Sequence, residues 1–244
     1  MVVWSQIALA GIWGGLLAVE RRAFLQAMFS RPLVAATGMG WILHDLPSGL
    51  FIGMVLELFH LGSANLGAAL PENETLAATG TTAAAVALAG NTGGSTPAYW
   101  SLAIILFAGL GPAGRLADQY LEEYSGRLAA KAVASAEQGD LARAVRQNLW
   151  GMWPHFVVFG AATALCALIG FALAPFAASL PLRALRGLAW SYPAMASVAA
   201  AIAARGSHAR KAALYAGVAA AAVVCAVALA PWISRVSLLG SPRP

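Results

Sequence analysis

Ionisable side chains lie within an otherwise apolar stretch in the first third of the chain. Residues 45–76 read DLPSGLFIGMVLELFHLGSANLGAALPENETL, and Glu57 stands there among strongly apolar neighbours. Residues 32–114 contain no Lys or Arg, so no basic residue nearby in sequence can pair with Glu57. A charged side chain at the centre of a bilayer costs roughly 2.5–3.5 kcal/mol on insertion scales, and such residues usually face a cavity or a substrate path. We therefore predict that Glu57 belongs to a binding site.

Amides and glycines in the same segment suit a hydroxylated ligand. Asn65 and Asn73 can each donate and accept hydrogen bonds, as a sugar hydroxyl requires. A carboxylate such as that of Glu57 accepts strong hydrogen bonds from hydroxyl groups. Gly62 and Gly67 would let the backbone approach a ligand closely. These residues predict a substrate-binding site for a neutral polyol rather than for an ion.

Prolines and glycines interrupt the helical pattern around this site. Pro47 and Pro71 lie near the two ends of the segment. Irregular backbone at membrane depth is tolerated only inside protein or around a water-filled cavity, and interrupted segments are a pointer to transporter binding sites. We expect Asp45, Pro47 and Pro71 to organise helix breaks rather than to contact the ligand.

The histidines allow two other kinds of chemistry. His60 follows Glu57 by three residues and shares its helical face, so a proton relay through these two side chains is an alternative. A metal site formed by His44, Asp45, Glu57 and His60 is not favoured, because the spacing matches no established metal motif. We predict no metal, no cofactor and no catalytic residue.

The elements that must hold these residues are membrane helices. The chain has 244 residues, of which 60% are hydrophobic and 10% are charged, and its mean hydropathy is +0.72. Soluble domains carry about 25% charged residues. The composition excludes a soluble enzyme, a disordered protein and a nucleic-acid binder, although the isoelectric point is near 9.7. We expect an all-α integral membrane protein, a polytopic bundle of six to eight spans with broken or re-entrant segments.

The predicted spans leave one long polar stretch between them. Basic residues cluster in 20–31, 113–148 and 205–211, which we place on the cytoplasmic side. The expected spans are 3–19, 48–69, 76–94, 97–114, 149–173, 188–204 and 212–233, with a further short apolar piece at 33–46.

The stretch 113–148 has the pattern of an amphipathic helical arm. Apolar side chains recur at a spacing of four residues, namely Leu116, Tyr120, Tyr124 and Leu128. Gly139 and Asp140 predict the end of one helix and the N-cap of the next. The arm is either a solvated connector or a surface for a partner. We predict a single domain, 1–244, with a first helical part (1–112), the arm (113–148) and a second helical part (149–244).

The run 30–78 resembles the membrane subunit IIC of the mannose-type phosphotransferase system (PTS), the mannose/fructose/sorbose family. The residues that carry this resemblance are Arg31-Pro32-Leu33, His44-Asp45, Ser48-Gly49, Leu56-Glu57 and Asn65-Leu66-Gly67-Ala68-Ala69. The resemblance implies a permease subunit that pairs with subunit IID and translocates a hexose-type sugar. Translocation would be coupled to phosphorylation of the sugar by IIB, with IIA and IIB as the phosphocarrier subunits. It implies no phosphoryl-transfer residue in this chain, a bacterial inner membrane location, and a homotrimer of IIC–IID pairs.

Three residues depart from the family pattern and leave two alternative functions open. They are His44, His60 and Asn73. One alternative is a membrane sensor or assembly partner that keeps the scaffold without transporting. The other is a proton-coupled carrier that uses Glu57 and His60.

Overall fold

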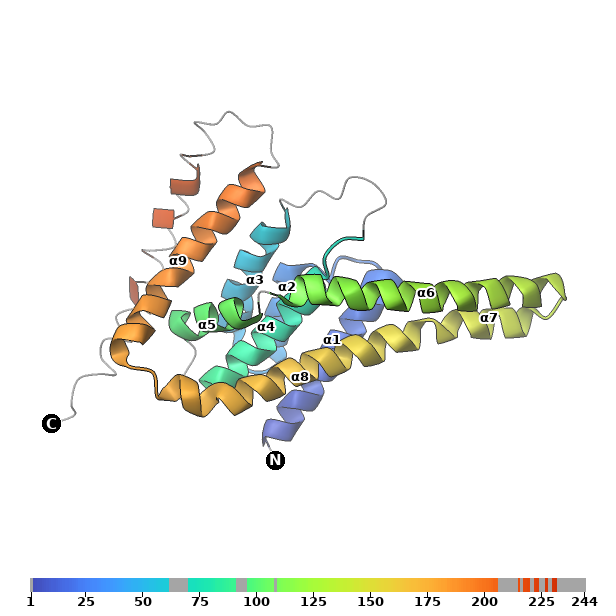
Figure 1. Cartoon of the computed structure of the whole chain (residues 1–244), viewed down its shortest axis with the longest axis horizontal. Coiled ribbons are helices and arrows are strands. Elements are labelled where there is room, and N and C mark those ends of the chain that lie inside the picture. The colour runs from blue at the N-terminus through green and yellow to red at the C-terminus, as the bar shows by residue number, and fades with distance from the viewer. Residues whose placement is uncertain are drawn as a thin grey trace.

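The fold is an assembly of helices with one long hairpin that projects from it (Figure 1). The computed structural model of the chain describes residues 2–61, 70–90, 96–107 and 109–205, with short pieces between 215 and 231. Within these ranges the regular elements are all helices, which confirms the all-α prediction: α1 (Val2–Arg22), α2 (Pro32–Ile42), α3 (Leu46–Leu61), α4 (Glu74–Ala89), α5 (Pro97–Phe107), α6 (Leu110–Glu137), α7 (Leu141–Trp150), α8 (Met152–Ala178) and α9 (Leu182–Arg205).

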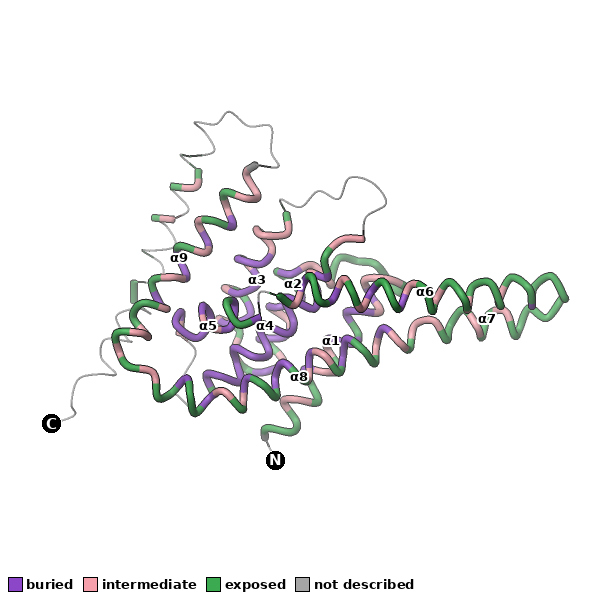
Figure 2. The backbone as a smooth tube through the Cα atoms, in the orientation of Figure 1, coloured by how far each residue is buried: buried purple, intermediate pink, exposed green. Residues whose placement is uncertain are grey.

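Helix α4 forms the centre of the molecule. Every residue from Thr75 to Ala89 is buried, and the tube of Figure 2 is purple along this helix. The helix consists mainly of Ala, Thr and Gly, and small side chains let neighbouring helices approach closely. A Cβ atom at Gly170 of α8 would lie only 2.6 Å from the carbonyl oxygen of Ala84 in α4. The small residues of α4 therefore permit the close packing of α8 against it.

Helices α2 and α3 form a tight hairpin that is too short to cross a bilayer as two spans. At about 1.5 Å per residue, these 11- and 16-residue helices are shorter than the roughly 30 Å hydrocarbon core. A Cβ atom at Gly49 would lie 2.3 Å from the carbonyl oxygen of Ala36, so the two backbones touch there. The hairpin is anchored from outside by the indole of Trp100, which donates to Ser48 Oγ at 2.7 Å. This hairpin brings the beginning of α2 beside the end of α3.

The described helices account for part of the predicted span count. Three helical stretches in the described residues are long and apolar enough to cross a membrane: Val3–Arg22, Leu141–Ala178 and Leu182–Ala204. A fourth arises if α5 and α6, bent by 42° at their junction, form one broken span. The count of six to eight is thus approximate. Much of the predicted span 212–233 lies outside the described residues.

Helices α6 and α7 build the predicted arm, and its turn follows local rules. Gly139 has φ of 80°, a left-handed conformation that favours glycine. The Asp140 carboxylate accepts a hydrogen bond from the backbone N–H of Arg143 at 3.0 Å, so it caps α7. The predicted helix break at Gly139 and Asp140 is confirmed.

Most of the apolar stripe on the arm faces outward, whereas Leu128 is half-buried at the base of the arm. Leu116, Tyr120 and Tyr124 are exposed, Tyr120 to 73%. The opposite side of α6 packs on the bundle and buries Asp118 and Leu121. Exposed aromatic and aliphatic side chains in a row are a feature of surfaces that meet a partner or a membrane.

Two glycine substitutions in the arm should change its stability in opposite directions. Gly126 lies within α6 with open space around the position of a Cβ atom, so Gly126→Ala should stabilise the arm by about 0.5–1 kcal/mol. Gly139→Ala should destabilise it by about 1–2 kcal/mol, because alanine is strained at positive φ. Hydrogen–deuterium exchange of amides in 113–150 measures both effects. Equal exchange in the two variants would contradict the expectation.

Candidate functional site

Glu57 and Arg31 form an ion pair where the α2–α3 hairpin opens. Arg31 Nε donates to Glu57 Oε1 at 3.0 Å, and its Nη2 donates to the same oxygen. Glu57 Oε2 accepts from the backbone N–H of Leu33 at 3.1 Å, in the first turn of α2. Glu74, at the start of α4, lies 3.6 Å from Arg31 Nη1. A cation between two carboxylates thus ties α2, α3 and α4 together.

Arg31 was not predicted as the partner of Glu57. The two residues are 26 positions apart, so no pattern of neighbouring residues indicates the pair. The Arg31 side chain is 34% exposed and that of Glu57 is 15% exposed, so the pair is partly accessible. A ligand hydroxyl could therefore compete with Arg31 for the carboxylate. The predicted contact between Glu57 and a sugar stays a prediction.

A cavity opens on a different side of α3 from the Glu57–Arg31 ion pair. It has a volume of about 620 Å³ and apolar walls from α3, α4, α5 and α9, and His60 and Glu72 are its charged or titratable lining residues. The His60 Nε2 atom lies 3.9 Å from Glu72 Oε2, and its Nδ1 atom lies 2.8 Å from the Leu56 carbonyl oxygen. Cavities of this size and mostly apolar character are typical of small-molecule sites. His60 lines this cavity, whereas Glu57 lies outside its lining and faces Arg31.

Asn73 occupies a buried position at the start of α4. Its Oδ1 accepts from the Leu76 N–H at 2.9 Å, which makes it the N-cap of the helix. Its Nδ2 donates to Asp118 Oδ2 at 3.0 Å, and the residue is only 2% exposed. Direct contact between this amide and a sugar, as predicted, would use its second N–H or the second lone pair of Oδ1, at a position that is buried here. That contact also stays a prediction.

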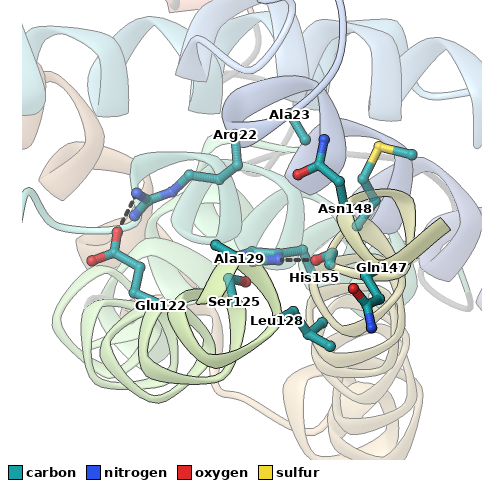
Figure 3. Close-up of a pocket in the computed structure, with 11 residues that line it drawn as sticks. Arg22, Ala23, Glu122, Ser125, Leu128, Ala129, Gln147, Asn148 and His155 are labelled. Carbon is teal, nitrogen blue, oxygen red and sulfur yellow. Dashed lines mark hydrogen bonds and ion pairs between the residues drawn. The ribbon is translucent and has the colours of Figure 1, made fainter. Parts of the chain in front are cut away.

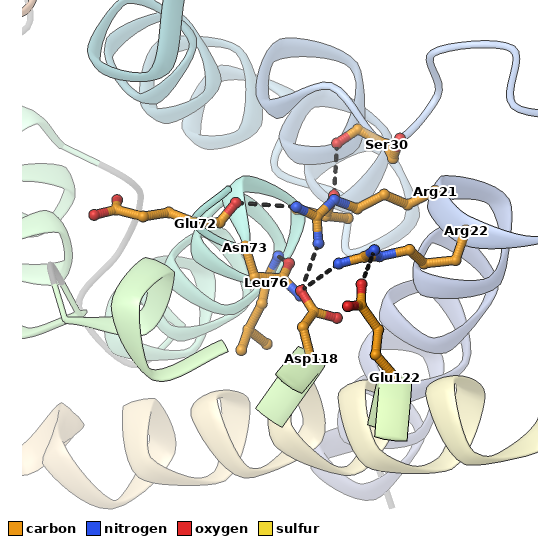
Figure 4. A network of polar contacts seen from close by, with 9 residues as sticks. Arg21, Arg22, Ser30, Glu72, Asn73, Leu76, Asp118 and Glu122 are labelled. Carbon is orange, nitrogen blue, oxygen red and sulfur yellow. Dashed lines mark hydrogen bonds and ion pairs between the residues drawn. The ribbon is translucent and has the colours of Figure 1, made fainter. Parts of the chain in front are cut away.

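Asp118 gathers the polar groups around Asn73 into a buried network (Figure 4). Arg21 Nη1 donates to Asp118 Oδ2 at 2.8 Å, and Arg22 Nη2 lies 3.2 Å from the same oxygen. Arg21 Nη2 also donates to the Glu72 carbonyl at 3.0 Å. The end of α1, the segment before α4 and the arm meet at this point. No local pattern in the sequence points to the network, because the contacts that join these elements link residues 45 or more positions apart.

A second, smaller cavity lies at the base of the arm (Figure 3). It has a volume of about 270 Å³, and its polar lining comes from Arg22, Glu122, Ser125, Gln147, Asn148 and His155. Arg22 and Glu122, both in its lining, form an ion pair with each other. The charges at this cavity therefore balance, and its chemistry is that of neutral donors and acceptors.

The remaining predicted residues divide into those at helix starts and those outside the described ranges. Asp45 precedes α3, and its carboxylate accepts from the Ser48 N–H at 3.3 Å and from Ser48 Oγ at 2.8 Å. Pro47 lies in the first turn of α3, and Pro71 lies shortly before α4. Gly62, Asn65 and Gly67 lie outside the described residues.

Comparison with known proteins identifies the family. The model of the family described as the PTS system sorbose-specific IIC component matches residues 4–205, which is most of the chain. The chain belongs to this family. It is a IIC membrane component of the mannose-type PTS, as the resemblance predicted, and a multi-pass membrane protein.

Individual relatives agree with this family. A 49-residue stretch is 45% identical to the mannose-specific EIIC component of Escherichia coli (strain K12) and, equally, to that of Shigella flexneri. This stretch covers 20% of the chain and only 18% of the length of each relative. Two solved structures share the fold over 98% of this chain and 96% of theirs at 21% identity. One is described as a membrane protein (TM-score 0.67), and the other is the mannose transporter ManYZ in complex with microcin E492 (TM-score 0.60).

Proposed function

We propose that this IIC component is the sugar-translocating subunit of a mannose-type PTS and that a hexose-type sugar binds at residues 57–73. The observation that carries the proposal is the placement of the two described ends of this segment, 57–61 and 70–73. Its start, Glu57, holds a partly accessible carboxylate, and Glu72 near its end lines the cavity of about 620 Å³. A hydroxylated ligand in that cavity would meet the polar side chains of His60 and Glu72 and an apolar wall, the combination that sugar faces require.

Within this site, the roles follow from the chemistry of each side chain. The Glu57 carboxylate would accept hydrogen bonds from sugar hydroxyls, and Asn65 and Asn73 would pair donors with acceptors. Gly62 and Gly67 would let the backbone approach the ligand. His60 and Glu72 would meet the part of the sugar that enters the cavity.

The proposed partners are a IID subunit and the phosphocarrier subunits IIA and IIB. The outward stripe of Leu116, Tyr120 and Tyr124 supports contact between the arm and a partner, because a solvated connector has no need of exposed aromatic rings. The arm joins the bundle at Arg21 and Arg22, in the basic segment that we place in the cytoplasm of a bacterium. A trimer of IIC–IID pairs is the proposed assembly.

Sugar uptake into cells or vesicles tests the function. Uptake of labelled mannose and glucose should require this chain, a IID partner and the phosphocarrier proteins. The sugar inside should be phosphorylated at the expense of phosphoenolpyruvate. Uptake that ignores phosphoenolpyruvate and collapses with an uncoupler would instead favour the proton-coupled carrier. Copurification with a IID partner but no uptake of any hexose would favour the sensor or assembly partner.

A further inference from the structure

We propose that Asp118 is a positioning residue. It holds Glu72 and Asn73, at the end of the proposed sugar-binding segment 57–73 (the sugar segment), against α1 and the arm. The expected effect of Asp118 on sugar uptake rests on the proposed function. The contacts themselves do not depend on that function, and they can be tested without sugar.

The Asp118 carboxylate is placed unusually for a residue on an amphipathic arm. Its side chain is 0% exposed. One oxygen, Oδ2, meets Arg21, Arg22 and the Asn73 amide, at 2.8, 3.2 and 3.0 Å. Among the described residues, the other oxygen, Oδ1, has no hydrogen-bond partner although it is buried. A buried carboxylate needs compensating charge and hydrogen bonds, so the position of Oδ2 fixes the groups that surround it.

Two contacts connect Asp118 to the sugar segment. The first is the bond from Asn73 Nδ2, which leaves Asn73 Oδ1 oriented to cap α4. The second runs through Arg21, which bridges Asp118 Oδ2 and the Glu72 carbonyl (Figure 4). Glu72 in turn directs its side chain to the cavity that also contains His60. Loss of the carboxylate would therefore release the backbone that aims Glu72 into the cavity.

Glu122 offers a matched comparison on the same helix. It stands one turn after Asp118 and also pairs with Arg22. Its side chain is 40% exposed, and the hydrogen bonds and ion pairs described for it do not reach Glu72 or Asn73. A general effect of breaking an arginine pair at the arm would appear in both Asp118→Asn and Glu122→Gln. Positioning of the sugar segment would appear only in Asp118→Asn.

Hydrogen–deuterium exchange in the full chain in detergent, bound to its IID partner where that copurifies, tests the contacts. Asp118→Asn should accelerate exchange of amides in 70–77 by at least tenfold and leave those of 160–175 in α8 within twofold of wild type. Glu122→Gln should leave both within twofold. Arg21→Gln, which keeps Asp118 paired with Arg22, should also accelerate exchange in 70–77. Unchanged exchange there in Asp118→Asn, or acceleration throughout the chain in both Asp118→Asn and Arg21→Gln, would overturn the proposal.

Transport kinetics give a readout that a purely structural role would not move. Asp118→Asn should raise the sugar concentration for half-maximal uptake at least fivefold and change the maximal rate per folded protein by less than twofold. A structural role would lower the amount of folded protein without changing the half-saturating concentration, and that result would overturn the positioning role. If the wild type takes up no hexose, the proposed function fails, and the exchange experiment still decides whether Asp118 holds residues 72 and 73.

Discussion

Glu57→Gln should lower sugar uptake by about 10- to 100-fold while leaving membrane insertion intact. A hydrogen bond to a charged group contributes about 1.5–3 kcal/mol, and each 1.4 kcal/mol is a factor of ten. Glutamine keeps the size of the side chain and can still accept from the Leu33 N–H, so the lost property is the charge. Initial rates of labelled-hexose uptake, normalised to the folded protein in the membrane, measure the effect. Glu123→Gln is the matched control, because Glu123 is exposed on the arm.

The ion pair with Arg31 offers a second explanation for a loss of uptake in Glu57→Gln, namely that Arg31 is left without its partner. A double variant distinguishes this explanation from the loss of a sugar contact. If Glu57 serves only to neutralise Arg31, the double variant Arg31→Gln, Glu57→Gln removes both charges and should restore uptake. If Glu57 binds the sugar, the double variant should stay as inactive as Glu57→Gln. We expect the second result. Recovery to more than half of the wild-type rate would show that the carboxylate acts through Arg31 alone.

Gly49→Leu should unfold the α2–α3 hairpin and cause the largest loss of stability among these variants. A Cβ atom at this position would lie 2.3 Å from the Ala36 carbonyl oxygen and 3.0 Å from the Cα atoms of Thr37 and Gly40. All three are backbone atoms, which no change of rotamer can move away. Overpacking typically costs 1–3 kcal/mol, and about 3 kcal/mol corresponds to a fall in melting temperature of roughly 6–12 °C for a chain of this size.

Thermal melts followed by size-exclusion chromatography in detergent measure this loss. Gly187→Ala in α9 is the control, because a Cβ atom there meets nothing within 4 Å. Gly49→Ala should fall between the control and Gly49→Leu. Since the hairpin is what brings Arg31 to Glu57, Gly49→Leu should also abolish uptake. A melting temperature for Gly49→Leu equal to that of wild type would refute the close packing of the two helices.

Local features of this protein were predictable because they depend on a few adjacent residues. The composition implied membrane helices, and the structure has helices at the predicted spans 3–19, 149–173 and 188–204. The turn of the arm followed from Gly139, which tolerates a positive φ, and from Asp140, whose carboxylate reaches an N–H only three residues away. Similarly, the resemblance over 30–78 depended on short runs of residues and led to the family that the comparisons show.

The face of the arm that meets the bundle was a matter of tertiary structure. The four-residue spacing identified an apolar stripe that includes Leu116 and Tyr120, yet those residues point outward and Asp118 is buried. The reason is that Arg21 and Arg22, at the end of α1, lie beside the inner face of α6 and pair with Asp118. Hydrophobic periodicity describes one helix at a time and carries no information about charges on a neighbouring helix.

By itself, the sequence determined the class of protein, the helices, the arm and the residues worth testing. Only the tertiary structure decided their partners, because each decisive contact joins residues that are 26 to 97 positions apart. Glu57 meets Arg31 only once α3 folds back along α2, and Asn73 meets Asp118 only once α6 lies beside α4. Helix formation follows from hydrogen bonds between residues four apart, whereas the packing of small residues sets which helices touch, and therefore which charges meet.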